Sequence, residues 1–256
     1  MKYSIILPYY KRPDYLHNTL VSFEYHYHRK DYEVIVVEDH KNNKDIIHHA
    51  TLIGILQKFN TRGMICGIAV SPLEGMWNPA PLFNIGVASC RGDILIISNP
   101  ECIHEVDILS GLDYEFGRDP NCYVICGCEE VVPQEGSIRR LFSFKDFKFK
   151  HRIWFQHSKF NNRGFHFCSA ISKEKYNEIG GFDNTFAFGV GYDDNDFRDN
   201  VIYNNIPIIL RDDLLVAHVR HGEDIIIPDR GTLTALNGEY YYEKLKNRGI
   251  ELEFAQ

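Results

Sequence analysis

Four short apolar runs alternate with helix-like stretches over the first hundred residues of this 256-residue chain, and this alternation constrains the fold most. The runs cover residues 4–8, 33–37, 65–71 and 94–98. Strands that are apolar throughout are buried on both faces, and helices between them indicate a parallel sheet with a helical layer on either side. We therefore expect an α/β fold. The expected helices of this half cover residues 12–27, 44–59 and 79–90, with Gly92 ending the third.

Polar or turn-forming residues follow three of these runs. Residues 8–9 end the first run, residues 38–39 the second and residues 99–101 the fourth. In open α/β sheets, ligands bind beyond the carboxyl ends of the strands. The sequence therefore predicts a binding site along this edge of the sheet.

The pattern changes after Val131. Residues 132–166 are polar, aromatic and basic without a clean periodicity. The elements expected after them are a strand at 165–172, helices at 173–179 and 194–203, and a strand at 214–219. Because the chain has no internal repeat and no Gly/Ser linker, we expect a single domain over residues 1–256. Its halves would be residues 1–130 and 131–256, with a small antiparallel element in the second.

Composition and charge narrow the possible functions. The net charge of −7 argues against nucleic acid as the main partner. No apolar run reaches the roughly 18 residues that a membrane span needs. The N-terminus starts a strand at once, so no secretory signal is evident. We therefore expect a cytoplasmic protein.

Seven cysteines make an odd count. Cys122, Cys126 and Cys128 lie in an apolar run with even spacing, which places all three on one face of a strand. A zinc site would need a further ligand pair, and the sequence contains no Cys-x-x-Cys pair. Buried, reduced thiols are therefore favoured over a zinc site.

A glycine-punctuated aromatic loop over residues 180–192 leads into Asp193, Asp194, Asn195 and Asp196. Carboxylates in the first turn of a helix lie beside the positive end of its dipole, where they remain ionised near neutral pH. An ionised carboxylate at the mouth of a pocket can take a proton from a hydroxyl group. Acids here can also simply cap a helix, which is the commoner role of an isolated pair.

His218 and His221 close the late strand. Side chains three residues apart in a strand point to opposite faces, so both reach one metal only if the chain turns after His218, as Gly222 would permit. With Glu101 they would supply one oxygen and two imidazole nitrogens. Mixed ligation of this kind suits Mn²⁺ better than Mg²⁺, which prefers oxygens and water. Taken alone, the pair is more readily explained as two ordinary histidines among twelve.

Several motifs occur together in a family's order. Residues 4–12, 33–39, 84–98 and 180–183 together resemble the inverting GT-A glycosyltransferases of family 2. Residues 189–197 and 218–221 look like the galactosyltransferase-type acidic motif and its metal-binding histidine. The resemblance covers about residues 3–224, which is most of the chain. Each motif alone is a weak signal, whereas the ordered set is strong.

The resemblance implies a Rossmann-like GT-A fold with a mostly parallel central sheet flanked by helices. It also implies transfer of a hexose or N-acetylhexosamine from a UDP-sugar to an acceptor hydroxyl, with inversion by single displacement. Residues 1–130 would hold the nucleotide sugar, and residues 131–256 the acceptor and the metal. The cofactor would be Mn²⁺, with Mg²⁺ as the alternative, and the acceptor would be a carbohydrate or glycoconjugate.

The same resemblance implies a role for each matching residue. Asp194 would be the catalytic base, and Asp39 would contact the uracil and ribose. The metal ligands would be Glu101, His218 and His221. The nucleotide site would include Pro8, Tyr9, Arg12, Glu38, Asp39 and Asn99.

Asn99 departs from the family's pattern, because it stands where the first acid of the Asp-x-Asp motif lies. The loss of that charge leaves open a catalytically inactive descendant that binds sugars or acts as a scaffold. A metal-dependent hydrolase that uses His218 and His221 is a third interpretation. It would leave the acids at the strand ends and the glycine loop without a role.

Three residues are weaker candidates for contact with the sugar or the acceptor. Trp77 and Trp154 could stack on a sugar ring, and Asp193 precedes the expected base. For Trp154 and the nearby His157 and His166, a structural aromatic cluster is favoured. The tyrosines at residues 240–242 fit a packing helix and are compatible with a homo-oligomer.

Overall fold

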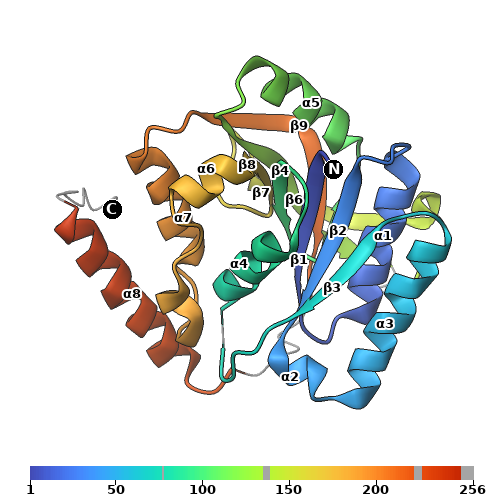
Figure 1. Cartoon of the computed structure of the whole chain (residues 1–256), viewed down its shortest axis with the longest axis horizontal. Helices are drawn as coiled ribbons and strands as arrows, with labels where there is room; N and C mark the ends of the chain where they lie inside the picture. Colours follow the sequence, from blue (N-terminus) through green and yellow to red (C-terminus); the bar gives the residue numbers. More distant parts are fainter. Residues whose placement is uncertain (77, 135–138, 222–226, 249–256) are drawn as a thin grey trace.

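The structure is a computed structural model that describes residues 1–76, 78–134, 139–221 and 227–248. The strands of the described residues form one sheet in the order β3-β2-β1-β4-β8-β6-β9-β5, and β7 pairs with β6 outside this path (Figure 1). The strands are β1 (Tyr3–Tyr9), β2 (Tyr32–Glu38), β3 (Cys66–Val70), β4 (Ile94–Ser98), β5 (Cys102–His104), β6 (Tyr123–Pro133), β7 (Phe149–Gln156), β8 (Cys168–Ser172) and β9 (Ile208–Val219).

Strand β1 lies between β2 and β4 and runs parallel to both. Tyr9 at the end of β1 is paired with Glu38 of β2, and Ile6 is paired with Ile97 of β4. Parallel neighbours bring their carboxyl ends to one edge of the sheet. The prediction that residues 8–9, 38–39 and 99–101 meet at one edge is therefore confirmed for the backbone.

Helices cover both faces of this sheet. Ile5 and Leu7 of β1 pack into a core with α1, α3 and α5, whereas Ile6 packs on the other face with α4, α6 and α7. This alternation follows from the two-residue period of a strand. The helices are α1 (Pro13–His26), α2 (His40–Asn43), α3 (Ile46–Thr61), α4 (Ala80–Ser89), α5 (Ile108–Arg118), α6 (Lys173–Glu178), α7 (Asp193–Tyr203) and α8 (Arg230–Asn247), with 3₁₀ turns η1 (Phe144–Asp146) and η2 (Asn184–Phe188). None of the described helices has both the length and the apolarity to cross a bilayer.

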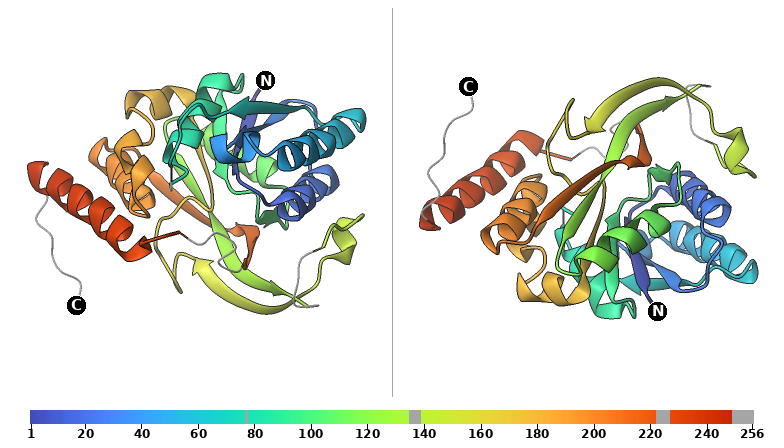
Figure 2. Two further views of the ribbon diagram at one scale, coloured as in Figure 1. Left: turned by 90° about the horizontal axis from the view of Figure 1, so that it is seen from below. Right: turned by 90° about the horizontal axis from the view of Figure 1, so that it is seen from above.

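The predicted α/β class is confirmed, and the antiparallel part is larger than expected. Strand β8 runs antiparallel to both β4 and β6, and β5 runs antiparallel to β9. Strands β6 and β7 form a hairpin that curves away from the rest of the sheet (Figure 2). The sequence did not predict β7, because three consecutive basic residues, 150–152, precede an apolar run of only three residues, 153–155. The late strand starts at Ile208, earlier than the predicted residue 214.

The three cysteines at 122, 126 and 128 are buried in the same core, as the even spacing predicted. All seven thiols are free, and the six other than Cys66 are buried. The described residues place no three cysteines close enough to share a metal ion.

Gly92 has a different role from the one predicted. Helix α4 ends at Ser89 with Cys90 as an extended C-cap, so Gly92 does not end it. The Gly92 N–H donates to Ser4 Oγ at 2.8 Å. A Cβ atom at this position would lie 2.6 Å from the Ser4 nitrogen. Close approach to strand β1 therefore explains the glycine.

Gly92→Ala should lower the free energy of unfolding by about 1–3 kcal/mol, because the added methyl group overpacks a backbone contact. Urea denaturation measures this change. Gly117→Ala in α5 is the matched control, since no heavy atom lies within 4 Å of the place that its methyl group would take. The control should be neutral or stabilising by up to about 1 kcal/mol. Equal denaturation midpoints for the two variants would contradict the close-packing role.

Candidate functional site

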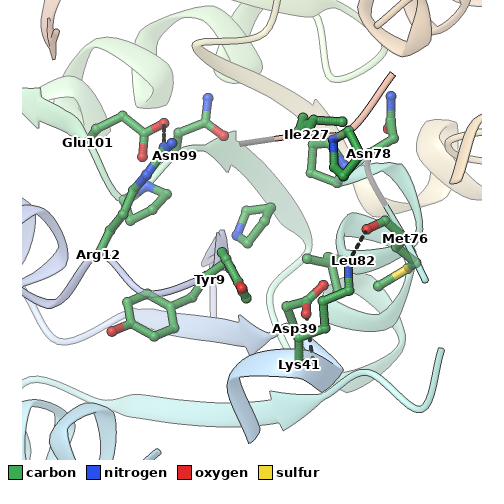
Figure 3. Close-up of a pocket in the computed structure, with 15 residues that line it drawn as sticks. Tyr9, Arg12, Asp39, Lys41, Met76, Asn78, Leu82, Asn99, Glu101 and Ile227 are labelled. Carbon is green, nitrogen blue, oxygen red and sulfur yellow. Dashed lines mark hydrogen bonds and ion pairs between the residues drawn. The ribbon is translucent and has the colours of Figure 1, made fainter. Parts of the chain in front are cut away.

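A pocket of about 430 Å³ opens at the carboxyl edge of β1, β2 and β4. Figure 3 shows Asp39 and Lys41 at one end, and Arg12, Asn99 and Glu101 at the other. The residues that line it are Pro8, Tyr9, Tyr10, Arg12, Asp39, Lys41, Met76, Asn78, Pro79, Leu82, Asn99, Pro100, Glu101, Ile227 and Pro228. Five of the six residues predicted for the nucleotide site therefore lie in one cavity.

Asp39 is held at its end of the pocket by the start of α2. Its carboxylate accepts a hydrogen bond from the Lys41 N–H at 2.8 Å, and its own N–H donates to the Tyr9 carbonyl at 2.9 Å. Lys41 also sends its ammonium group to the Met76 carbonyl at 3.3 Å. Lys41 was not predicted from the sequence, although its place two residues after a strand-end acid was a usable signal.

Glu38 does not line this pocket, which corrects its predicted place in the nucleotide site. Its side chain is fully buried and is hydrogen-bonded to His49 Nδ1 at 2.7 Å and Asn43 Nδ2 at 3.4 Å. Successive side chains of a strand point to opposite faces, so Glu38 and Asp39 cannot both face the cavity. Tyr9 is among the residues that line the pocket, although it is fully buried within the core.

Strand pairing brings Glu101 and the late histidines together. The Val219 N–H donates to the Glu101 carbonyl at 3.0 Å, and Cys102 is paired with His218 across β5 and β9. Strand β9 ends at Val219, so His221 is released from the alternation that would have turned it away. Both imidazoles come close to Glu101, although β9 continues through Val219 and does not turn directly after His218. Gly222 lies outside the described residues.

The ligand atoms of Glu101, His218 and His221 all lie within 4.8 Å of one another. One Glu101 oxygen is 3.8 Å from His218 Nε2 and 3.5 Å from His221 Nε2. Burial opposes ionisation of Glu101, but hydrogen bonds from His218 and His221 and the charge of Arg12 hold its pKa well below the usual range. Two buried atoms, Glu101 Oε2 and His218 Nδ1, have no hydrogen-bond partner among the described residues. One carboxylate and two imidazoles form a ligand set that fits a divalent transition metal such as Mn²⁺.

Helix α7 presents the acidic motif near the same pocket. Asp193, buried in the first turn, accepts a hydrogen bond from Asn78 Nδ2 at 2.8 Å. Asn78 lines the pocket, so this bond joins the two parts of the site. Asp194 is about a third exposed and lies 2.8 Å from Nδ1 of the buried His166. The predicted base therefore has one fixed neighbour and an accessible side.

The pKa values of Asp193 and His166 depend on their charged neighbours. Burial and the charge of Asp194 raise the pKa of Asp193 to about 6. Burial lowers the pKa of His166, but the charges of Asp194 and Asp193 outweigh burial and raise it. His166 was predicted to belong to a structural aromatic cluster, and its ring does pack edge-on against Phe83 and Phe182. Its contact with Asp194 was missed because the two residues come from separate elements.

The sequence matches the model of glycosyl transferase family 2 over residues 4–180, more than half of the chain. The chain belongs to glycosyl transferase family 2. No curated protein matches it.

Solved structures with the same fold support the predicted GT-A architecture. GalNAc-T7 with UDP, GalNAc and Mn²⁺ has a TM-score of 0.69 at 14% identity, covering 96% of this chain and 48% of its own. TarS 1–349 of S. aureus with UDP-GlcNAc has a TM-score of 0.64 at 14% identity, covering 93% and 66%. The mannosyltransferase PcManGT of Pyrobaculum calidifontis, with GDP-Man and Mn²⁺, has a TM-score of 0.60 at 14% identity, covering 100% and 66%. This family 2 chain thus spans about half to two thirds of those chains.

Helix α8 holds the acidic motif of this family 2 chain in place. Asn237 Nδ2 donates to the carbonyls of Phe186 and Gly191, at 3.1 and 2.9 Å. A Cβ atom on Gly189 would lie only 2.1 Å from Asn237 Oδ1, so the loop needs glycine there. Tyr192, directly before α7, adopts a left-handed conformation with φ of 68°. Such a conformation is strained for a tyrosine and persists where neighbouring contacts impose it.

Lys244 adds ion pairs to the contact between α8 and the acidic motif. Its ammonium group lies 2.7 Å from Asp183 and 2.8 Å from Asp196, which stand on either side of the loop. The tyrosines at residues 240–242 were predicted to form a packing helix, and they lie within α8. Tyr240 and Tyr241 bond to Asp183 and Asp199. The homo-oligomer stays a prediction.

The two tryptophan candidates have different outcomes. Trp77 lies outside the described residues. Trp154 lies on β7, where its ring is 4.3 Å from that of His157 and 6.3 Å from that of Phe160. It does not line the pocket, so the structural aromatic cluster is the better description of this residue. The division of residues 1–256 into one domain with two halves stays a prediction.

The raised pKa of Asp193 predicts a pH-dependent effect of Asp193→Asn. A carboxyl group with a folded pKa of about 6 and an ordinary value of 3.8 retains its proton more strongly in the folded state. Its contribution to stability is full below about pH 4 and is lost as the pH rises through about 6. The asparagine of the variant does not titrate, so the variant lacks this loss of stability with rising pH. Its side-chain oxygen can still accept the hydrogen bond from Asn78. The melting temperature of Asp193→Asn minus that of the wild type should therefore increase between about pH 4 and 7.

Melting curves of both proteins at one-unit steps from about pH 4 to 8 measure this difference. The difference should level off above about pH 7, where the wild-type carboxyl is ionised in both states. A difference that stays constant over the whole range would contradict the assignment.

Proposed function

We propose that this chain is a metal-dependent glycosyltransferase that moves a hexose or N-acetylhexosamine from a UDP-sugar to an acceptor hydroxyl. Transfer proceeds by a single displacement with inversion. The observation that carries the proposal is the order of groups along one pocket: Asp39 at one end, the cluster of Glu101, His218 and His221 at the other, and Asp193 joined to the wall through Asn78.

The pocket accommodates a nucleotide sugar in one direction. Asp39 offers a fixed carboxylate to the hydroxyl and N–H donors of a nucleoside. Arg12, at the end of the pocket that holds Glu101, provides a cationic group for a diphosphate, which the metal-ligand cluster would hold through its cation. Complexes of structurally similar proteins with UDP, UDP-GlcNAc or GDP-Man support a nucleotide-sugar donor. Two of those complexes contain Mn²⁺, which supports the same choice of metal here.

The departing nucleoside diphosphate gains negative charge as the bond to the sugar breaks. Glu101, His218 and His221 would hold a divalent cation, which supplies positive charge for this leaving group. Arg12 lines the same end of the cavity and adds a positive charge of its own. Asn99 provides an amide at the place of a carboxylate, so the diphosphate meets one negative charge fewer.

Asp194 is the proposed base. His166 Nδ1 contacts one Asp194 oxygen at 2.8 Å, and this contact fixes the orientation of the carboxylate. The other oxygen takes the proton of the acceptor hydroxyl as that oxygen bonds to the anomeric carbon. The bond from this carbon to the diphosphate oxygen breaks on the opposite face. One carboxylate suffices because water is not the nucleophile and no glycosyl-enzyme forms.

Nucleotide sugars should stabilise the protein, and more strongly with Mn²⁺. At a ligand concentration about 100 times Kd, the free energy of unfolding rises by about 2.7 kcal/mol. For a chain of this size that corresponds to a rise in Tm of about 5–10 °C. The measurement is a thermal-shift panel of UDP-, GDP- and ADP-sugars, each with and without Mn²⁺. UDP-sugars should give the largest shift, and a chelator should remove the part that depends on metal.

His218→Ala is the matched control, and it should abolish the gain from Mn²⁺ while keeping part of the shift from nucleotide alone. Stabilisation without release of UDP in the presence of acceptors would favour an inactive, sugar-binding protein. No shift with any nucleotide sugar would overturn the proposal.

Asp194→Asn should lower kcat by about 10²–10⁴-fold, because a positioned general base contributes about that much. UDP release in the presence of acceptor measures the rate, and the same thermal-shift titration measures UDP-sugar binding. Binding should stay within about threefold, since Asp194 does not line the nucleotide pocket. Asp199→Asn, on the same helix, is the comparison for general damage to α7. Retained turnover in the Asp194 variant would reject the assignment of the base.

A further inference from the structure

Arg12 occupies a fixed position between the first strand and the first helix. Pro13 is the first residue of α1, and the Arg12 carbonyl accepts the N–H of Leu16 at 3.1 Å. The backbone is therefore held by the start of α1, and the guanidinium can move by rotation of its own side chain. That side chain is 18% exposed and lines the pocket.

The guanidinium engages two of the three groups of the metal-ligand cluster. Arg12 Nη1 donates to Glu101 Oε1 at 2.7 Å, and Nη2 lies 3.2 Å from His221 Nδ1 (Figure 3 shows the bond to Glu101). Guanidinium is a donor only, so His221 Nδ1 must be the acceptor. The same Glu101 oxygen faces both imidazoles. The Arg12 guanidinium, a monovalent cation, thus occupies lone pairs of Glu101 and His221, two of the groups that would bind a divalent metal.

Contact of Arg12 with Glu101 and binding of a divalent metal to Glu101 compete, because each places positive charge beside this carboxylate. Glu101 is the single carboxylate of the cluster and is buried, so it needs one positive partner. Arg12 provides that charge without metal. A divalent ion bound to Glu101 would leave the guanidinium a few ångströms from a like charge in a poorly solvated site. Within the described part of the chain, the buried Arg12 Nε has no hydrogen-bond partner, so this position of Arg12 does not satisfy the whole guanidinium.

A diphosphate changes this balance. It carries enough negative charge for both the divalent ion and the guanidinium, and the fork of an arginine matches phosphate oxygens. Because Arg12 already lines the pocket, rotation of the side chain alone would move its charge from Glu101 towards a bound diphosphate.

We propose that Arg12 is a resident cation that closes the Glu101–His218–His221 cluster and yields it when a divalent metal and a nucleotide diphosphate bind together. This inference rests on the proposed function, because it needs that cluster to be a metal site. It makes free metal a weak ligand and makes each of the two ligands strengthen the binding of the other. Such coupling is reciprocal and typically amounts to about 5–150-fold in affinity.

The test measures binding of Mn²⁺ itself. Mn²⁺ is titrated into the wild type, Arg12→Met and Arg12→Lys without nucleotide, and the free ion is followed by its electron paramagnetic resonance signal. The methionine variant keeps side-chain length and removes the charge. It should bind Mn²⁺ about tenfold tighter than the wild type, which lies within the usual range of coupling. Lysine keeps a charge but loses the fork, so its affinity should lie between the two.

The titrations are then repeated with saturating UDP. The wild type should bind Mn²⁺ much more tightly than before, whereas Arg12→Met should gain less because its cluster no longer needs to be vacated. Arg118→Met, an exposed arginine on α5, is the control and should match the wild type in both conditions. His218→Ala added to each protein should remove the binding, which shows that all titrations report the same site.

Each outcome of the titrations supports or overturns the inference about Arg12. Mn²⁺ affinity in Arg12→Met that equals or falls below the wild-type value, while still lost on His218→Ala, overturns the inference and leaves the proposed function standing. Absence of Mn²⁺ binding in every protein, with and without UDP, overturns both. Should Arg12→Met fail to fold without metal, Arg12→Lys carries the test. It must then bind Mn²⁺ more tightly than the wild type.

Discussion

A buried carboxylate that needs positive charge organises the most polar end of this site. Glu101 is 6% exposed, and its surroundings keep its pKa low despite burial. An unpaired charge in such a place would strongly destabilise the fold. The turn between β4 and β5 carries Glu101, the pairing of β5 with β9 brings His218 to it, and the junction between β1 and α1 brings Arg12. Three separate parts of the fold thus converge on the Glu101 side chain.

The two ends of the site depend on different parts of the fold. The parallel strands β1, β2 and β4 set the pocket and its strand-end residues, because their register fixes where each strand stops. The acidic motif is set by loops and by α8, through Asn237 and Lys244. Asn78 connects the two ends through its bond to Asp193. A rigid sheet therefore positions the binding groups, and tertiary contacts far along the sequence position the proposed base.

Much of the scaffold could be predicted from the sequence, because apolar runs and their ends depend on local patterns. The strands of the first half, the edge where they stop and the meeting of Glu101 with two histidines are examples. Glu38 was misplaced because a strand end fixes which residue is last, but not which of two neighbours faces the cavity. Gly92 was interpreted as a helix end, whereas its cause is a contact with β1. His166 was missed because its partner Asp194 is distant in sequence and no periodic pattern links them.

The dependence of the acidic motif on α8 has a consequence for the order in which the protein matures. During synthesis, Asp193 and Asp194 leave the ribosome well before Asn237 and Lys244. The sheet can acquire its strands and the pocket its walls while the loop before α7 still lacks its holding contacts. Structural competence of the whole site is therefore reached only after α8, the last described helix, has been synthesised and has docked.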